Sequence, residues 1–143
     1  MKIEIRNSDI HDIVVFCIDD ILKDEVIETC PLIVLNKKDT KTIDDTFLYN
    51  YYFSWENNGS VICLGNGSLY NHSIVPNSKY IKDLGNRKII FIAIRDIKKD
   101  EEIFVNYNGI PECDKKVWFE LKKLDNAKYT LFDFKNRIKE LKQ

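Results

Sequence analysis

The residues best suited to chemistry lie in one polar run between two apolar stretches. The run is Gly65-Asn66-Gly67-Ser68-Leu69-Tyr70-Asn71-His72-Ser73-Ile74-Val75-Pro76-Asn77. Its glycines permit a ligand to approach the backbone closely, and the adjacent Asn71 and His72 supply hydrogen-bond donors and acceptors side by side. The run therefore suits the binding of a polar ligand. An elaborate polar loop without a ligand is the alternative interpretation.

A second cluster begins about thirty residues further along the chain. It reads Glu101-Glu102-Ile103-Phe104-Val105-Asn106-Tyr107-Asn108-Gly109, which is typical of a strand that ends in a turn. A tyrosine at the end of a strand is usually a core or rim residue. Taken alone, Tyr107 therefore indicates no particular reaction.

The composition describes one globular domain of ordinary charge. Of the 143 residues, 44% are apolar and 12% aromatic, which is enough for one sizeable core. The formal net charge of −1 lacks the basic balance typical of nucleic-acid-binding domains, so we expect no direct nucleic-acid partner. No run of 18 apolar residues occurs, so no membrane span is predicted.

The N-terminal residues and the cysteines indicate an intracellular protein. Residues 1–6 alternate polar and apolar side chains, which predicts a strand and not a signal peptide. The four cysteines form no Cys-x-x-Cys pair, so we expect free thiols in a reducing compartment. Neither His11 nor His72 lies at ligand spacing from a cysteine, and we expect no metal site. The predicted location is the cytoplasm, or a host nucleus for a viral or secreted effector protein.

Short apolar strands separated by turns must position the two clusters. Segments rich in Ile, Val, Phe and Tyr occur at residues 2–6, 13–18, 25–35, 49–55, 60–63, 77–83, 87–94 and 102–107. Tight turns are predicted at 57–59 and 85–86. Residues 36–46 are polar and predict either a loop or a short helix. The pattern as a whole predicts one mostly β domain.

One short pattern occurs twice, at residues 20–27 and 96–103. Each copy has an apolar residue, then a charged turn, then the start of a strand. We interpret this as one turn structure used twice, with Ile21 and Ile97 in the core beneath it. Two copies are too few for a solenoid.

The last segment has a different period. Apolar residues recur there at helical spacing, at Leu131, Phe134, Ile138 and Leu141. This predicts an amphipathic helix over 131–142. Its apolar stripe must be buried against the domain, a partner subunit or a substrate, so a homodimer remains open.

The two clusters, in this order, resemble the paired signature of the SET-domain family of protein-lysine methyltransferases. The family combines an Asn-His-Ser-x-x-Pro-Asn loop with a later Glu-Glu-x-x-x-x-Tyr strand, and both occur here. Tyr51-Tyr52-Phe53-x-Trp55 and the segments 106–109 and 117–119 are similar to compact microbial and viral members without zinc-binding modules. The resemblance covers residues 1–121, which we expect to form the SET domain. Residues 122–143 would then be a helical extension packed on it.

The resemblance implies a mostly β fold of small curved sheets with a C-terminal pseudoknot, plus a C-terminal α-helix. It also implies that S-adenosylmethionine and a protein lysine meet in a narrow channel. Tyr107 matches the catalytic tyrosine of the family, whose hydroxyl orients the reacting groups. The expected cofactor-binding residues are Asn71, His72, Tyr70, Ile13, Val14, Val15, Phe16 and Trp118. The expected residues of the lysine channel are Tyr80, Val105 and Tyr52.

The sequence departs from the family pattern at four glycines. Family members carry a Gly-x-Gly motif against the cofactor, where this chain has Asp12 and Val14. Asp24 and Asp100 replace glycines at the two charged turns, which aspartate should tolerate. The leading interpretation is methyl transfer from S-adenosylmethionine to the ε-amine of a lysine in a protein substrate, a histone or another protein. The alternatives are a catalytically weak or inactive SET fold that binds proteins, and an unrelated β-rich structural protein.

Overall fold

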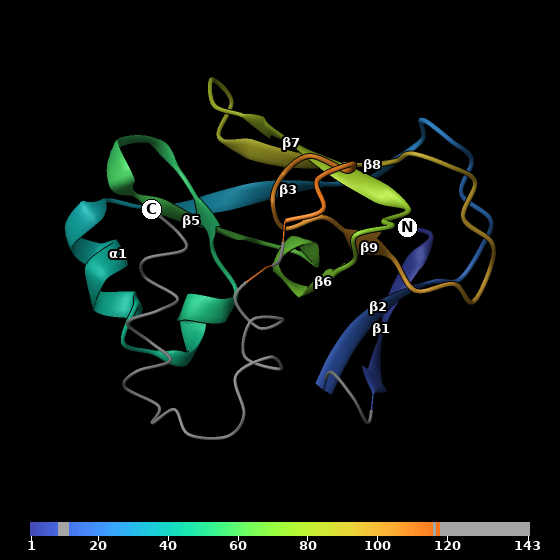
Figure 1. The fold of residues 1–143 in the computed structure, drawn as a ribbon, viewed down its shortest axis with the longest axis horizontal. Coiled ribbons are helices and arrows are strands. Elements are labelled where there is room, and N and C mark those ends of the chain that lie inside the picture. The colour runs from blue at the N-terminus through green and yellow to red at the C-terminus, as the bar shows by residue number, and fades with distance from the viewer. Residues whose placement is uncertain (9–11, 116, 118–143) are drawn as a thin grey trace.

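The computed structural model describes residues 1–8, 12–115 and 117, which form a mostly β fold (Figure 1). The strands are β1 (Ile3–Ser8), β2 (Asp12–Cys17), β3 (Val26–Leu35), β4 (Phe53–Ser54), β5 (Ser60–Cys63), β6 (Asn71–His72), β7 (Ser78–Asp83), β8 (Lys88–Ala93) and β9 (Phe104–Val105). The described residues also contain one α-helix, α1 (Lys37–Ile43). Short 3₁₀ turns lie at Phe47–Asn50, Glu56–Asn58 and Gly67–Leu69.

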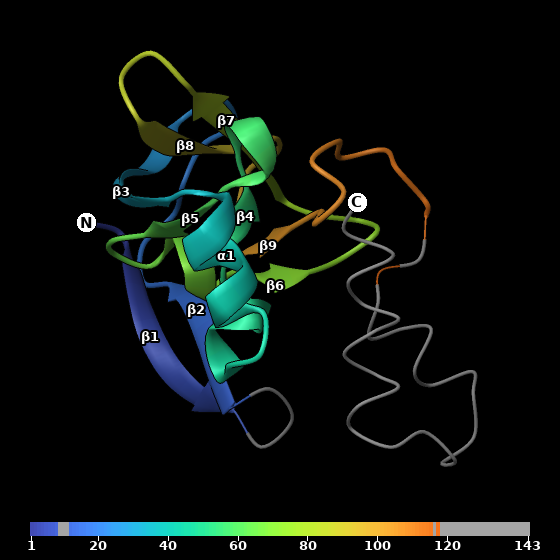
Figure 2. The same cartoon turned by 90° about the vertical axis from the view of Figure 1, so that its left-hand side faces the viewer.

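The central element is a five-stranded antiparallel sheet with the strand order β4-β5-β3-β8-β7. β3 spans ten residues and pairs with two neighbours at different points along its length. Cys30 faces Ile89 of β8, whereas Leu32 faces Cys63 of β5. β1 and β2 form a hairpin at the opposite end of the molecule from β7 and β8 (Figure 2). The parallel pair of β6 and β9 lies between these two ends.

The five-stranded sheet is strongly curved, so its two edge strands approach each other. The ring of Phe53 on β4 packs edge-on against the ring of Tyr80 on β7, with their centroids 5.0 Å apart. Lys82 Nζ on β7 donates a hydrogen bond to the main-chain oxygen of Ser54 on β4 at 2.6 Å. The prediction of a mostly β fold with small curved sheets is therefore confirmed.

The hydrophobic core packs against β8 of the sheet and against both polar clusters. Ile89, Phe91 and Ala93 alternate along β8 and are fully buried, as the two-residue period of a strand requires. Tyr70 and Val105 belong to the same buried cluster. The rings of Tyr70 and Phe91 lie 4.6 Å apart. The segments that carry the candidate functional residues are thus anchored directly in the core.

The repeated pattern of the sequence forms two turns that bond to each other reciprocally. Ile21 and Ile97 are both buried and exchange two main-chain hydrogen bonds, of 2.9 and 2.8 Å. The side chain of Asp20 accepts a hydrogen bond from Lys99 N at 2.9 Å, and Asp96 makes the equivalent bond to the other turn. The interpretation of one turn structure used twice, with both isoleucines in the core, is confirmed.

The aspartates that replace glycines in these turns adopt the backbone conformation that glycine favours. The φ angles of Asp24 and Asp100 are 69° and 66°. Aspartate reaches this left-handed region at lower cost than most residues. The two replacements therefore keep the backbone conformation that glycine would adopt in these turns.

The predicted strand at residues 49–55 is wrong for most of its length. Strand structure there is confined to β4, and a 3₁₀ turn occupies Phe47–Asn50. Thr46 caps this turn by accepting a hydrogen bond from Leu48 N. The rings of Phe47 and Tyr51 pack 5.3 Å apart on it. Capping and ring packing here outweigh the β-propensity of the aromatic residues.

The predicted strand at 102–107 is likewise shorter, because only β9 pairs regularly within it. The other predicted strands agree with the structure to within two residues at each end. α1 confirms the short-helix alternative for residues 36–46. Asn36 caps this helix by accepting a hydrogen bond from Asp39 N at 2.9 Å.

Several predictions concern residues that the structure does not describe. The C-terminal helix at 131–142, the extension 122–143 and Trp118 lie outside the described residues. Within the described part of the chain, no helix has the length and apolar character needed to cross a membrane.

Candidate functional site

β6 and β9 bring the two polar clusters of the sequence together. They pair in parallel, with Asn71 opposite Phe104 and His72 opposite Val105. Ser73 N donates a further hydrogen bond to Val105 O at 3.0 Å. The pairing joins the Asn-His loop to the later strand, as the predicted pseudoknot requires.

The side chain of Asn77 holds the second cluster in place. Its Nδ2 donates to Glu102 O at 2.8 Å, and its Oδ1 accepts from Phe104 N at 2.8 Å. Asn77 is only 2% exposed, so both bonds are shielded from water. Removing this side chain would leave buried polar groups unpaired, which costs more than the bonds themselves contribute.

His72 fixes the main chain at the predicted catalytic tyrosine. Its Nδ1 accepts a hydrogen bond from Tyr107 N at 3.0 Å, and the two ring centroids lie 5.2 Å apart. Because Nδ1 is the acceptor, it carries no proton in this arrangement, and the proton of the neutral ring is on Nε2. His72 therefore links the loop that carries it to the end of the second cluster.

The hydroxyl of Tyr107 is also held in a fixed position. It donates a hydrogen bond to Tyr70 O at 2.8 Å. Burial raises the pKa of Tyr107 above its ordinary value, so the hydroxyl stays protonated near neutral pH. A protonated hydroxyl of fixed orientation is suited to orienting a reacting group and not to removing a proton from it.

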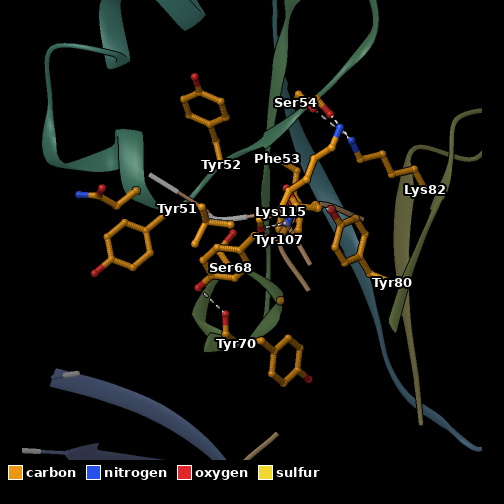
Figure 3. A pocket seen from close by; sticks show the side chains of 14 residues that line it. Tyr51, Tyr52, Phe53, Ser54, Ser68, Tyr70, Tyr80, Lys82, Tyr107 and Lys115 are labelled. Carbon is orange, nitrogen blue, oxygen red and sulfur yellow. Dashed lines mark hydrogen bonds between the residues drawn. The ribbon is translucent and has the colours of Figure 1, made fainter. Parts of the chain in front are cut away.

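Tyr107 lines a cavity of about 330 Å³, in which six of the fourteen lining residues are aromatic (Figure 3). The aromatic lining residues are Tyr51, Tyr52, Phe53, Tyr70, Tyr80 and Tyr107. Burial raises the pKa of Tyr80 to about 12, and its hydroxyl makes a long contact of 3.4 Å with Tyr107 O. Tyr52 donates a hydrogen bond to Asp44 Oδ1 at 2.8 Å. A cavity with these walls suits an alkyl chain that ends in a small polar group.

The structure brings some predicted channel residues together and leaves one apart. Tyr52 and Tyr80 line the cavity beside Tyr107. Val105 is 1% exposed and belongs to the core, and it is not among the residues that line the cavity. Its neighbours on β6, Asn71 and His72, are half-buried.

The predicted cofactor residues on β2 lie next to the second cluster. Ile103 N donates to Val15 O at 2.9 Å, and Cys17 N donates to Glu101 O at 2.9 Å. Among the described residues, no main-chain hydrogen bond joins the second cluster to a β2 residue that precedes Val15. The main chain of Val14 therefore lies just past the last of these bonds.

The side chains of β2 differ in burial. Val14 and Val15 are 1% and 0% exposed, whereas Ile13 is 41% exposed. Phe16 is half-buried, and the guanidinium of Arg6 lies 4.7 Å from its ring centroid. The residue that replaces the second glycine of the family motif, Val14, is thus turned into the protein.

Sequence reasoning missed two carboxylates that support the Asn-His loop. Glu28 on β3 accepts hydrogen bonds from the Tyr70 hydroxyl and from Asn66 N, both at 2.9 Å. Glu102 accepts a hydrogen bond from Asn71 Nδ2 at 2.7 Å. The signal for Glu28 is its position as an acidic residue inside the predicted strand at 25–35, directly after the apolar pair Val26-Ile27.

Comparison with known proteins decides the family. Residues 12–108 match the family described as SET domain. The chain belongs to the SET-domain family. It is 29% identical, over 119 residues, to a Schizosaccharomyces pombe protein named histone-lysine N-methyltransferase, H3 lysine-37 specific, with 82% of this chain and 77% of the relative covered.

Two further proteins extend the comparison within the SET family. Protein L678 of Acanthamoeba polyphaga mimivirus, described as a candidate SET-domain protein, is 37% identical over 73 residues, which cover 48% of this chain and 28% of that protein. A solved Plasmodium falciparum structure, described as a candidate histone methyltransferase, is 33% identical with a TM-score of 0.61 and covers 74% of this chain and 92% of that one. The predicted family and the predicted enzyme class, protein-lysine methyltransferase, are confirmed.

Proposed function

We propose that this SET-domain protein transfers a methyl group from S-adenosylmethionine to the ε-amine of a lysine in a protein substrate. The observation that carries the proposal is the Tyr107 hydroxyl, which Tyr70 O holds in the wall of an aromatic cavity. The Schizosaccharomyces pombe relative, named for methylation of a histone lysine, supports a lysine as the acceptor.

The cavity favours the reactive form of a lysine side chain. A lysine has a pKa of about 10.4 in water and must lose a proton before its nitrogen can attack a methyl group. The aromatic rings of Tyr52 and Tyr80 offer little hydration to an ammonium group and so disfavour it. The proton passes to solvent, because the buried hydroxyl of Tyr107 is itself protonated and cannot accept it. This hydroxyl aligns the free amine, and alignment is the main requirement of such a displacement.

S-adenosylmethionine, when bound, supplies a methyl group on a positively charged sulfur, which is already a good electrophile. The residues that would hold it are Asn71 and His72 on β6 and the main chain of residues 13–16 on β2. Tyr70 and Trp118 complete the proposed set. The buried side chain of Val14 supports this role, because the main chain beside it can approach a ligand without an intervening exposed side chain. Replacement of the family glycine is then compatible with binding through the backbone.

The decisive test measures binding and transfer separately. Titration of the purified protein with S-adenosylmethionine in a calorimeter should give a single-site isotherm. Incubation with labelled cofactor and a cell lysate should label protein lysines, and the Tyr107→Phe variant should not label them. Binding without labelling of any protein would contradict the proposed enzyme function.

A second function, a SET fold that binds proteins without turnover, is favoured by the missing Gly-x-Gly motif. The double variant Asp12→Gly with Val14→Gly distinguishes the two functions. Tighter cofactor binding with retained methyl transfer supports a weakened but working enzyme site. If the native chain binds no cofactor and only the double variant does, the binding module is the correct function.

A further inference from the structure

The side chain of Lys82 on β7 lines the cavity, and the groups that its ammonium contacts are uncharged. Its Nζ lies 2.6 Å from Ser54 O and 3.3 Å from Ser54 Oγ. The side chain is half-buried, and burial lowers the pKa of Lys82 below its ordinary value. The structure shows no ion pair for Lys82 with any described residue. The described cations that do form ion pairs are Lys2, Arg6, Lys88, Arg95 and Lys98.

A second ammonium group, that of Lys115, lines the same cavity. Its main-chain oxygen accepts a hydrogen bond from Asn108 Nδ2 at 2.9 Å, which ties it to the residue after Tyr107. Figure 3 shows the side chains of Lys82 and Lys115 extending toward Ser54 from two directions. No aspartate or glutamate is among the described residues that line the cavity. The chain as a whole has a net charge of −1, so the excess of positive charge is a property of this cavity and not of the whole protein.

This arrangement favours the binding of an anion. A half-buried ammonium held by neutral oxygens loses hydration without gaining a counter-charge. A carboxylate placed between Lys82 and the exposed Lys115 would supply this counter-charge through charge-assisted hydrogen bonds.

We propose that Lys82 and Lys115 form a subsite for an aspartate or glutamate side chain of the substrate, two residues from the lysine that enters the cavity. This inference rests on the proposed function and names its substrate class. In an extended peptide, side chains two residues apart point to the same side, about 7 Å from each other. Tyr107 and Lys82 line the same cavity, so an acceptor lysine at Tyr107 and a carboxylate at Lys82 would enter it from the same side of the peptide. The preferred substrates are proteins with an exposed acidic residue two positions before or after the methylated lysine.

Peptide mixtures with one central lysine test the subsite. The residue two positions from this lysine is fixed as Glu, Gln or Arg, and the other positions are randomised without lysine. With labelled S-adenosylmethionine, the full chain should methylate the Glu peptides about five times faster than the Gln peptides and more than five times faster than the Arg peptides. The preference should weaken at 0.5 M salt because salt screens exposed charges.

Three variants assign the preference to the proposed residues. Lys82→Met should lower the Glu-to-Gln ratio to below about twofold, whereas Lys82→Arg should retain the preference because it keeps the positive charge. Lys115→Met should lower the ratio in part. Lys79→Met removes a lysine from the same strand at a position that does not line the cavity, so it should leave the ratio unchanged.

A binding measurement separates failure of the subsite from failure of the proposed function. The same peptides, with the central lysine replaced by methionine, are titrated by fluorescence anisotropy. Methyl transfer without a Glu preference, or with one that survives Lys82→Met, overturns the subsite and leaves the function intact. Glu-selective binding that requires Lys82, in a protein that transfers no methyl group, supports the subsite and overturns the function. Peptides with phosphoserine at the fixed position are titrated alongside, and selectivity for them without any for glutamate overturns the carboxylate assignment.

Discussion

Replacing Tyr107 by phenylalanine should separate methyl transfer from folding and cofactor binding. The substitution removes one hydroxyl and its 2.8 Å hydrogen bond to Tyr70 O. Loss of such a bond lowers the free energy of unfolding by about 1 kcal/mol, or Tm by roughly 4 °C in a domain of this size. With its hydrogen held by Tyr70 O, the hydroxyl keeps an oxygen lone pair that can accept a hydrogen bond from the reacting amine. A preorganised polar group of this kind contributes about 3 kcal/mol to the transition state. We therefore expect kcat to fall roughly 100-fold, with an almost unchanged Kd for S-adenosylmethionine.

Ser78→Ala is the matched control for this substitution. Ser78 Oγ donates a hydrogen bond of 2.7 Å to Phe104 O, so its loss also removes one hydroxyl-to-carbonyl bond, but Ser78 does not line the cavity. Both variants should lose similar stability in urea unfolding, and only Tyr107→Phe should lose kcat in a filter-binding assay with labelled cofactor. If Tyr107→Phe keeps kcat within about threefold of the native protein, or if both variants lose it equally, the assigned role of the hydroxyl is wrong.

Three further predictions, with four substitutions, test the structure more widely. Asp24→Gly should leave the protein more stable to urea than Asp100→Gly. Both substitutions relieve a positive φ angle, but only Asp100→Gly removes an ion pair, that with Arg6, so the reverse order of stability would contradict this. His72→Ala should lower the free energy of unfolding by about 1–3 kcal/mol and weaken cofactor binding in calorimetry, and unchanged affinity would refute its binding role. Asp20 has a pKa below its ordinary value of 3.8, first because Lys99 N donates to it, so the stability it contributes is present above pH 3.8 and is lost as the pH falls through the lower folded-state value. Urea unfolding at pH 7 and pH 3 should therefore show a smaller loss for Asp20→Asn than for the native chain, and equal losses would exclude this contribution.

Local sequence signals predicted those parts of the fold that are determined by side-chain alternation along a strand or by the residue types of a turn. β8 alternates buried and half-buried residues along its length, and its strand was predicted to within one residue at each end. The two turns were predicted from a repeated pattern, with Ile21 and Ile97 in the core, whereas the hydrogen bonds between the two turns were not predicted. The strand expected at 49–55 failed for the opposite reason. A cap at Thr46 and contacts between rings decide that segment, and neither follows from the β-propensity of single residues.

The sequence motifs identified the candidate site, but the residues of other strands that contact those motifs were not predicted. Tyr107 and His72 stand out in the sequence because they lie in a specific motif pair. Glu28 and Lys82 lie in ordinary strands, and their roles depend on which distant residues they meet. Lys82 reaches Ser54 only because the sheet curves until its edge strands approach. Sheet curvature is set by the whole set of strands and is not visible in any local pattern.

The parallel pairing of β6 with β9 has a consequence for the order in which the chain folds. Hairpins such as β7–β8 join neighbouring segments and can form early, whereas β6–β9 must close a loop of about thirty residues around them. The hydrogen bond between Tyr107 and His72 can form only after β6 has paired with β9. We therefore expect the cavity to assemble late in folding and to open first when the protein is warmed. Loss of activity would then precede loss of the sheet, and the working temperature of the protein would be set by this junction and not by its core.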